Sequence, residues 1–327
     1  MIHHGGNLSA AKATFGADIP GGWIDLSTGI NPVPYPASAL SPGALNRLPE
    51  PADEQALIAA ARGYYDAASN ANVIAAPGTQ ALIQWLPYVR RIGRVDVVAP
   101  TYGEHAPRWA DAGHTVRNIN TLDDADADVV VIVNPNNPDG RTAPRDALIL
   151  AAERQAARGG LLVVDEAFAD VAPEASLTGT AMDGLVVLRS FGKFFGLAGL
   201  RLGFAIGDKT ITEALADKLG PWAVSTPALD IGRAALNDTA WQMATRARLI
   251  ADTAKLDNLL SAAGLVLMGG TDLYRLVETE DADTLYHSLG QAGILIRTFP
   301  THPRWARFGL PATDAQWDRL ATALATT

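Results

Sequence analysis

Lys193 stands in a loop of small and aromatic residues that could carry carbonyl chemistry. Residues 189–203 read RSFGKFFGLAGLRLG and follow an apolar run that is typical of a buried strand. Apolar surroundings disfavour the charged form of a lysine, so its neutral amine can form a Schiff base with a carbonyl. Ser190 and Arg201 stand three residues before and eight residues after Lys193, and both could bind a phosphate on the same ligand. A surface lysine before a glycine-rich turn is the alternative interpretation.

Two groups of residues at the ends of other apolar runs could hold the rest of such a ligand. Gly78, Thr79 and Gln80 open a predicted helix, where backbone N–H groups, a hydroxyl and the helix dipole could bind a phosphate. The alternative is that Thr79 only caps this helix. Tyr102 follows the next run and could stack on a planar ring, although a single aromatic residue is more often part of the core.

Asn137 and Asp165 add an amide and a carboxylate after two further apolar runs. Asn137 lies in a turn that contains two Asn-Pro pairs, which leaves side-chain amides available as donors. Asp165 directly follows a buried run, where a carboxylate is costly unless it is paired, and a protonated ring nitrogen would be a suitable partner. The alternative for Asn137 is that it only belongs to a turn. The alternative for Asp165 is that it caps a helix or forms a salt bridge.

These residues can meet only if the ends of several strands share one edge of a sheet. Short Val- and Leu-rich runs alternate with helical stretches, and continuous apolar runs are typical of strands covered on both faces. We therefore predict an α/β fold with a mostly parallel sheet, in which ligands bind at the carboxyl ends of the strands. The predicted strands are 73–75, 95–99, 129–133, 161–164, 185–188 and 203–206, and the predicted helices are 52–68, 79–91, 105–112 and 145–158.

The chain divides into three predicted segments. Residues 1–45 are rich in proline and glycine, which predicts an arm with little regular structure that packs on the small domain and the active site. Residues 46–228 form the predicted large domain, and 229–327 the predicted small α+β domain, which opens with a long helix at 238–263. Its other predicted elements are strands 265–268, 273–277, 294–297 and 304–309 and helices near 281–291 and 313–325.

Composition argues against several classes of function. The 327 residues are 48% hydrophobic and carry a net charge of −9, which disfavours nucleic acid or an anionic membrane as the main partner. The absence of cysteine excludes disulfides, Fe–S clusters and thiolate zinc sites, and the six histidines form no metal-binding pattern. Without a signal peptide or a run of eighteen apolar residues, a soluble, cytoplasmic protein is expected.

A single ligand could bind all of the candidate residues at the strand ends. It would carry a phosphate, a planar ring with a phenolic oxygen, a ring nitrogen that can be protonated, and an aldehyde, and pyridoxal 5′-phosphate (PLP) meets that description. In order and spacing the motifs resemble the fold-type I PLP-dependent enzymes, in the class of the histidinol-phosphate aminotransferases. The resemblance covers nearly the whole chain. It implies that Lys193 binds the PLP aldehyde and that Asp165 keeps the pyridine nitrogen protonated, the two catalytic roles.

The same resemblance implies a set of residues around the cofactor. Asn137 would donate to the phenolic oxygen and Tyr102 would stack on the ring. The remaining members would bind the cofactor phosphate, with Gln80 the weaker candidate: Gly78, Thr79, Gln80, Ser190 and Arg201.

The N-terminal residues narrow the resemblance to the threonine-phosphate decarboxylases. His4-Gly5-Gly6-Asn7 and the segment WIDLSTGINP at 23–32 are similar to that group. By this resemblance His4 and Asn31 would frame the substrate pocket, Arg297 would bind a substrate phosphate, and Arg307 would clamp the substrate carboxylate. The implied activity is the decarboxylation of L-threonine O-3-phosphate to aminopropanol phosphate in cobalamin biosynthesis, by a homodimer.

Two residues depart from the aminotransferase pattern, and two rival functions stay open. Phe168 stands where relatives commonly carry a tyrosine that donates to the phenolic oxygen. Leu48 stands where many carry a tyrosine that reaches the cofactor phosphate across the dimer. One rival is an aminotransferase acting on histidinol phosphate, and the other is a non-catalytic protein of the same fold. Intact Lys193, Asp165 and Arg201 argue against the second rival.

Overall fold

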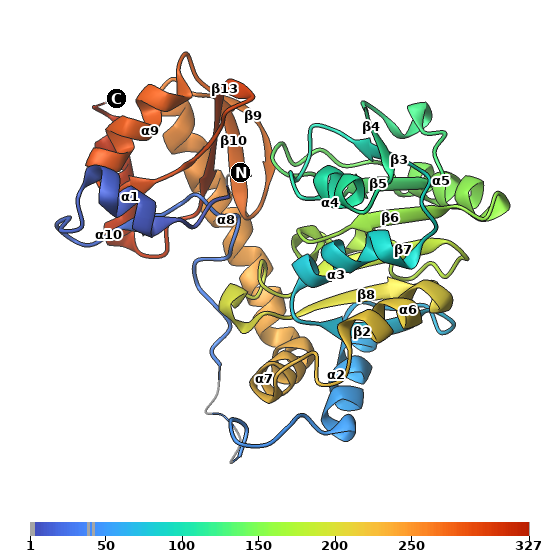
Figure 1. The fold of residues 1–327 in the computed structure, drawn as a ribbon. Coiled ribbons are helices and arrows are strands. Elements are labelled where there is room, and N and C mark those ends of the chain that lie inside the picture. Colours follow the sequence, from blue (N-terminus) through green and yellow to red (C-terminus); the bar gives the residue numbers. More distant parts are fainter. Residues whose placement is uncertain (1–3, 38–39, 41–42, 327) are drawn as a thin grey trace. The chain divides into compact units, whose positions relative to one another are not determined.

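The computed structural model describes residues 4–37, 40 and 43–326, which fall into two compact units (Figure 1). The large unit comprises Tyr35–Asn137 and Thr142–Gln242, and the small unit comprises the described residues of Met1–Pro34, Pro138–Arg141 and Met243–Thr327. The division into domains at residues 45 and 228 stays a prediction.

The large unit is built on a seven-stranded sheet, in which a mostly parallel arrangement is confirmed (Figure 1). Strands β7, β6, β5, β3 and β4 are parallel neighbours, whereas β8 runs antiparallel to both β7 and β2. Because β2 and β7 both oppose β8, they run in the same direction. The order is β2 (Asn72–Ala76), β8 (Gly203–Gly207), β7 (Leu185–Ser190), β6 (Leu161–Asp165), β5 (Val129–Val133), β3 (Arg94–Val98) and β4 (Thr115–Ile119).

Helices cover both faces of this sheet, which explains the continuous apolar runs of the central strands. Ile83, Trp109 and Leu215 belong to the hydrophobic core on one face, and Leu148 and Ala152 belong to the core on the other. The helices are α2 (Pro51–Tyr64), α3 (Thr79–Trp85), α4 (His105–Asp111), α5 (Arg145–Ala157), α6 (Lys209–Leu219) and α7 (Thr226–Asn237), with 3-10 turns η1 (Leu86–Val89), η2 (Leu122–Asp124), η3 (Ala169–Val171), η4 (Pro173–Ala175) and η5 (Ala198–Leu200).

Helices α6 and α7 were not predicted, and two further elements of the large unit differ from the prediction. The helix expected at 79–91 ends at Trp85 and continues as the 3-10 turn η1, because Pro87 has no N–H group to extend the α-helical ladder. Strand β4 was not predicted. Its sequence is TVRNI and three of its five residues are exposed, so this strand at the end of the sheet has no continuous apolar run to reveal it.

The small unit combines a four-stranded antiparallel sheet with helices. A short parallel pair of strands also connects its N-terminal segment to its C-terminal segment. The sheet order is β12 (Arg297–Phe299), β13 (His302–Gly309), β10 (Tyr274–Glu278) and β9 (Val266–Thr271), and the pair is β1 (Ile24–Asp25) with β11 (Ile294–Leu295). Its helices are α1 (Leu8–Phe15), α9 (Ala282–Gln291), α10 (Asp314–Leu324) and most of α8 (Thr239–Ala262).

The expectation that the N-terminal arm has little regular structure is wrong at α1. Asn7 begins this helix and its side-chain oxygen accepts a hydrogen bond from the Ala10 N–H at 3.1 Å. The Phe15 ring then packs on Tyr286, with 5.6 Å between the ring centroids. A cap and one apolar anchor are enough to hold eight residues as a helix once α9 is present to pack against.

None of the helices in the described part of the chain has the length and apolar composition needed to cross a membrane.

Candidate active site

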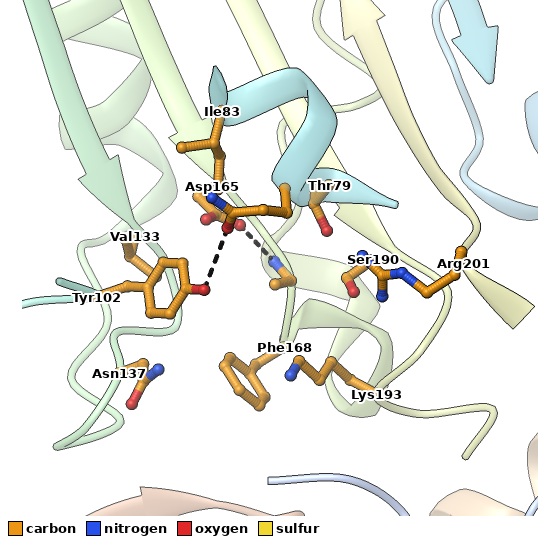
Figure 2. Close-up of a pocket in the computed structure, with 12 residues that line it drawn as sticks. Thr79, Ile83, Tyr102, Val133, Asn137, Asp165, Phe168, Ser190, Lys193 and Arg201 are labelled. Atoms are coloured by element: carbon orange, nitrogen blue, oxygen red, sulfur yellow. Dashed lines mark hydrogen bonds between the residues drawn. The ribbon is translucent and has the colours of Figure 1, made fainter. Parts of the chain in front are cut away.

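The polar residues predicted to hold the cofactor collect in one pocket of the large unit (Figure 2). Because β2, β3, β5, β6 and β7 run in the same direction, their carboxyl ends meet at one edge of the sheet, and the antiparallel β8 begins there. Gly78 precedes the first of the lining residues, at the start of α3. The pocket is lined by Thr79, Gln80, Ile83, Tyr102, Val133, Asn137, Asp165, Ala167, Phe168, Ser190, Lys193 and Arg201.

One side of the pocket gathers a guanidinium and two hydroxyls. Arg201, in the left-handed backbone region at φ 56°, lies close to Gly78, with Ser190 and Thr79 nearby (Figure 2). A Cβ on Gly78 would come within 2.6 Å of Arg201 Nη2, and Gly78 itself has φ +85°. Glycine is therefore required both for the backbone conformation and for the close approach. The helix cap is Gly78 rather than Thr79, so the Thr79 hydroxyl lines the pocket.

Asp165 presents a buried carboxylate to the pocket from the end of β6. Its side chain is nearly inaccessible, and Oδ1 accepts a hydrogen bond from the Ala167 N–H at 3.1 Å. Oδ2 lies 2.9 Å from Nε2 of His105, which is equally buried at the start of α4. An imidazole on one oxygen and a backbone amide on the other fix the direction of the carboxylate.

Sequence reasoning missed His105. Its only signal is position, because it stands three residues after Tyr102 and at the start of the helix that follows the same strand. The two rings meet edge to face, with 6.0 Å between their centroids. The residue therefore links two members of the predicted set that come from different strands.

Lys193 reaches the pocket from a loop held by aromatic side chains. Phe191, Phe194 and Phe195 are all fully buried, and the rings of Phe191 and Phe195 stack at 4.3 Å. The Lys193 Nζ lies 5.4 Å from the centre of the Phe168 ring, within the range of a cation–π contact (Figure 2). Phe168 thus offers a π face where a tyrosine would also offer a hydroxyl donor.

A buried ion cluster joins the two strands that carry Asp165 and Ser190. Arg189 on β7 donates to Glu166 Oε2 at 2.7 Å and also to Asp170, and its guanidinium lies over the Tyr65 ring. Burial raises the pKa of Glu166, and the positive charge of Arg189 opposes that shift. Removing one partner would leave an uncompensated buried charge, so this cluster holds the ends of β6 and β7 together. It was not predicted from the sequence.

Arg297 and Arg307, the predicted anion-binding arginines, are direct cross-strand partners on β12 and β13 of the small unit. Arg307 is only 6% exposed, its Nη2 donates to the Ser27 carbonyl at 2.8 Å, and its guanidinium lies 5.0 Å from the Tyr274 ring centre. Burial, with a smaller contribution from the charge of Arg297, lowers the pKa of Arg307 to about 10. Like charges directly opposite each other destabilise a sheet.

The predicted N-terminal substrate residues also belong to the small unit. The glycines after the exposed His4 pack against Ser27, because a Cβ on Gly5 would come within 2.2 Å of the Ser27 carbonyl oxygen. This is the carbonyl that accepts from Arg307, so the structure brings the His4 segment and Arg307 together at Ser27. Asn31 is buried, and its side-chain oxygen accepts from Arg248 Nη2 at 2.6 Å.

Comparison with known proteins identifies the family. The family described as aminotransferase class I and II matches residues 23–324. A protein named threonine-phosphate decarboxylase from Pseudomonas aeruginosa is 44% identical to this chain, over 99% of this chain and 97% of that protein. A protein of the same name from Sinorhizobium sp is 45% identical, over 99% of this chain and 98% of that protein. The structure of histidinol-phosphate aminotransferase from Sinorhizobium meliloti in complex with pyridoxal-5′-phosphate has a TM-score of 0.80 and 20% identity, over 97% of this chain and 93% of that one. The predicted resemblance and fold class are confirmed, and the chain belongs to the aminotransferase class I and II family.

Proposed function

We propose that this protein is a PLP-dependent decarboxylase that converts L-threonine O-3-phosphate to aminopropanol phosphate in cobalamin biosynthesis. The observation that carries the proposal is the directly opposed pair of Arg297 and Arg307 on neighbouring strands. Such a pair is unfavourable unless anionic groups neutralise it, and the substrate supplies a carboxylate and a phosphate. The two relatives named threonine-phosphate decarboxylase, which match nearly the whole chain, support the same substrate.

The donor set of the pocket fits PLP. The guanidinium of Arg201 and the hydroxyls of Thr79 and Ser190 suit its phosphate, and the close approach of Arg201 to Gly78 leaves no room for a side chain at position 78. A buried carboxylate at Asp165 suits a protonated ring nitrogen, and Lys193 suits the aldehyde. Asn137 is the proposed donor to the phenolic oxygen, and Tyr102 the proposed stacking partner of the ring.

The side chains of the pocket then have distinct tasks in the reaction. The chemistry that bound PLP would supply is a sink for the electron pair left at the substrate Cα when a bond to this carbon breaks. Asp165, oriented by His105 and by the Ala167 N–H, keeps the ring nitrogen protonated and so strengthens that effect. Lys193 holds the aldehyde before the substrate arrives. Once the substrate's amino group has displaced it and passed it a proton, Lys193 in its ammonium form would donate that proton to Cα in the place vacated by CO2.

The choice of bond follows from how the substrate is held. Arg307 is proposed to bind the carboxylate and Arg297 the phosphate, with His4 and Asn31 lining the substrate pocket. Two anchored anionic groups fix the rotation about the bonds to Cα, which is a positioning effect. The bond to the carboxylate is the one placed for cleavage in a decarboxylase, whereas an aminotransferase would instead remove the proton from Cα.

The direct test supplies threonine phosphate to the purified protein with PLP and measures CO2 and keto acid. Release of CO2 with one equivalent of aminopropanol phosphate is expected. In the Arg297→Ala variant, KM for threonine phosphate should rise by roughly one to two decades, with much less effect on unphosphorylated threonine. Conversion of histidinol phosphate to its keto product, without CO2 from threonine phosphate, would replace the decarboxylase with an aminotransferase.

We also propose that the protein acts as a homodimer. Leu45 and Leu48 are 80% and 62% exposed, and apolar side chains at such exposure are suited to contact with a second subunit. Leu48 occupies the position at which many relatives carry a tyrosine that reaches across the dimer.

A further inference from the structure

A short chain of hydrogen bonds leads from the pocket wall to a nearly buried carboxylate that the proposed reaction does not use. The Tyr102 hydroxyl donates to Oε1 of Gln80 at 3.2 Å, which is the dashed line at Tyr102 in Figure 2. The Nε2 of Gln80 donates in turn to Oε2 of Glu104 at 3.2 Å. Glu104 is 8% exposed and lies just before α4. All three residues belong to the large unit.

The carboxylate determines which way the amide of Gln80 points. An amide can present either its oxygen or its NH2 group to a neighbour, whereas an ionised carboxylate only accepts hydrogen bonds. Glu104 therefore selects the orientation in which the NH2 group of Gln80 faces it. The amide oxygen must then face Tyr102, whose hydroxyl has to act as the donor.

Arg108 gives this carboxylate a positive partner at the same oxygen that accepts from Gln80. Its Nε lies 3.6 Å from Oε2 of Glu104, and its Nη2 lies 2.8 Å from Asp111 Oδ2. The guanidinium is thus held between one nearly buried and one exposed carboxylate. Asp111 contacts the same arginine without contacting Gln80, which makes it a matched control for Glu104.

We propose that Glu104 is a positioning residue for the cofactor: by orienting the Gln80 amide it holds the Tyr102 ring in the rotamer that stacks on PLP. The inference rests on the proposed function, because it requires PLP in this pocket. It assigns Gln80 a role other than phosphate binding, since both ends of its amide are engaged by Tyr102 and Glu104. A tyrosine fixed at its hydroxyl loses little rotamer freedom when a ring stacks on it.

The test measures PLP binding and cofactor geometry rather than turnover. PLP is titrated onto the cofactor-free wild type, Glu104→Ala and Asp111→Asn, and bound PLP is followed by absorbance and by its visible circular dichroism. Glu104→Ala should bind PLP about tenfold more weakly, the loss expected from one hydrogen bond to a charged group, with a reduced dichroic signal. The Glu104→Gln variant keeps the shape but permits both orientations of Gln80, and should show an intermediate loss of about threefold. Asp111→Asn should match the wild type.

A double-mutant cycle with Tyr102→Phe separates positioning from general destabilisation. Phenylalanine keeps the ring and lacks the hydroxyl that contacts Gln80, so Glu104→Ala should have no further effect on PLP affinity or dichroism in that background. Equal losses in both backgrounds, or wild-type affinity and dichroism in both Glu104 variants, would overturn the inference alone. A wild-type protein that takes up no PLP would instead refute the proposed function, and this inference with it.

Discussion

Replacing Arg307 with methionine should make the protein more stable while depriving it of its substrate. Methionine fills a similar volume without charge, and Arg307 is only 6% exposed. The guanidinium is buried opposite Arg297, and both effects disfavour its charged form. The substitution therefore removes a buried charge that the fold holds at a net cost.

The magnitude follows from the pKa of Arg307, which burial lowers from its ordinary value to about 10. At 1.36 kcal/mol per unit, keeping the guanidinium charged costs the folded state about 3 kcal/mol. Loss of the charged hydrogen bond to the Ser27 carbonyl costs about 2 kcal/mol. The variant should thus gain about 1 kcal/mol, in the same sense as other replacements of buried charge by apolar groups.

The pH of the measurement matters because the lowered pKa links stability to protonation. At this group the folded state binds fewer protons than the unfolded state from about pH 10 up to the ordinary pKa of a guanidinium. The penalty is therefore present in full below about pH 10 and declines as the pH rises through that window. At pH 8 the wild type carries all of it, and the difference between wild type and variant is largest.

Thermal unfolding at pH 8, with and without threonine phosphate, tests this reasoning. Without ligand, Arg307→Met should melt roughly 1–2 °C above the wild type. Threonine phosphate at 100 times the wild-type Kd should stabilise the wild type by about 2.7 kcal/mol and the variant by only about 0.4 kcal/mol. KM for threonine phosphate should rise by about two decades in the variant.

A neighbouring arginine provides the control. Arg304 lies on the same strand, is 59% exposed at its side chain and pairs with Glu278 at 3.2 Å, so Arg304→Met should change neither the melting temperature appreciably nor KM. The reasoning is refuted if Arg307→Met is destabilised by more than 1 kcal/mol, or if its KM equals that of the wild type.

Three other predictions concern the cofactor residues and the assembly. Lys193→Ala should lose both turnover and the absorbance of protein-bound PLP, and normal activity in this variant would exclude Lys193 as the cofactor lysine. Asp165→Ala should lower kcat by several orders of magnitude by removing the counter-charge of the ring nitrogen, whereas a change in stability with intact kcat would make Asp165 a structural acid. Light scattering should give the mass of a dimer, and replacing both Leu45 and Leu48 with serine should weaken it, whereas a fully active monomer at high dilution would refute the dimer.

Much of the fold was predictable because its signals are local. The central strands are buried on both faces, so each is a short continuous run of Val, Ile and Leu, and β5, VVVIV, was predicted to the residue. The pocket residues were predictable for a related reason. They directly follow those runs in the chain, and the strand directions then place them at one edge of the sheet. Strand β4 and helix α1 escaped prediction because one is mostly exposed and the other depends on packing against α9.

The partnerships between distant residues were decided by the tertiary structure. No spacing in the chain indicates that His105 meets Asp165 across 60 positions, or that Gln80 bridges Tyr102 and Glu104. Their amino-acid types set what each side chain can donate or accept, but packing of α3 and α4 on one sheet brings the groups within hydrogen-bond distance. The opposition of Arg297 and Arg307 depends likewise on strand register. A shift by a single residue would turn one arginine to the other face, so the opposition of these two charges exists only in the folded sheet.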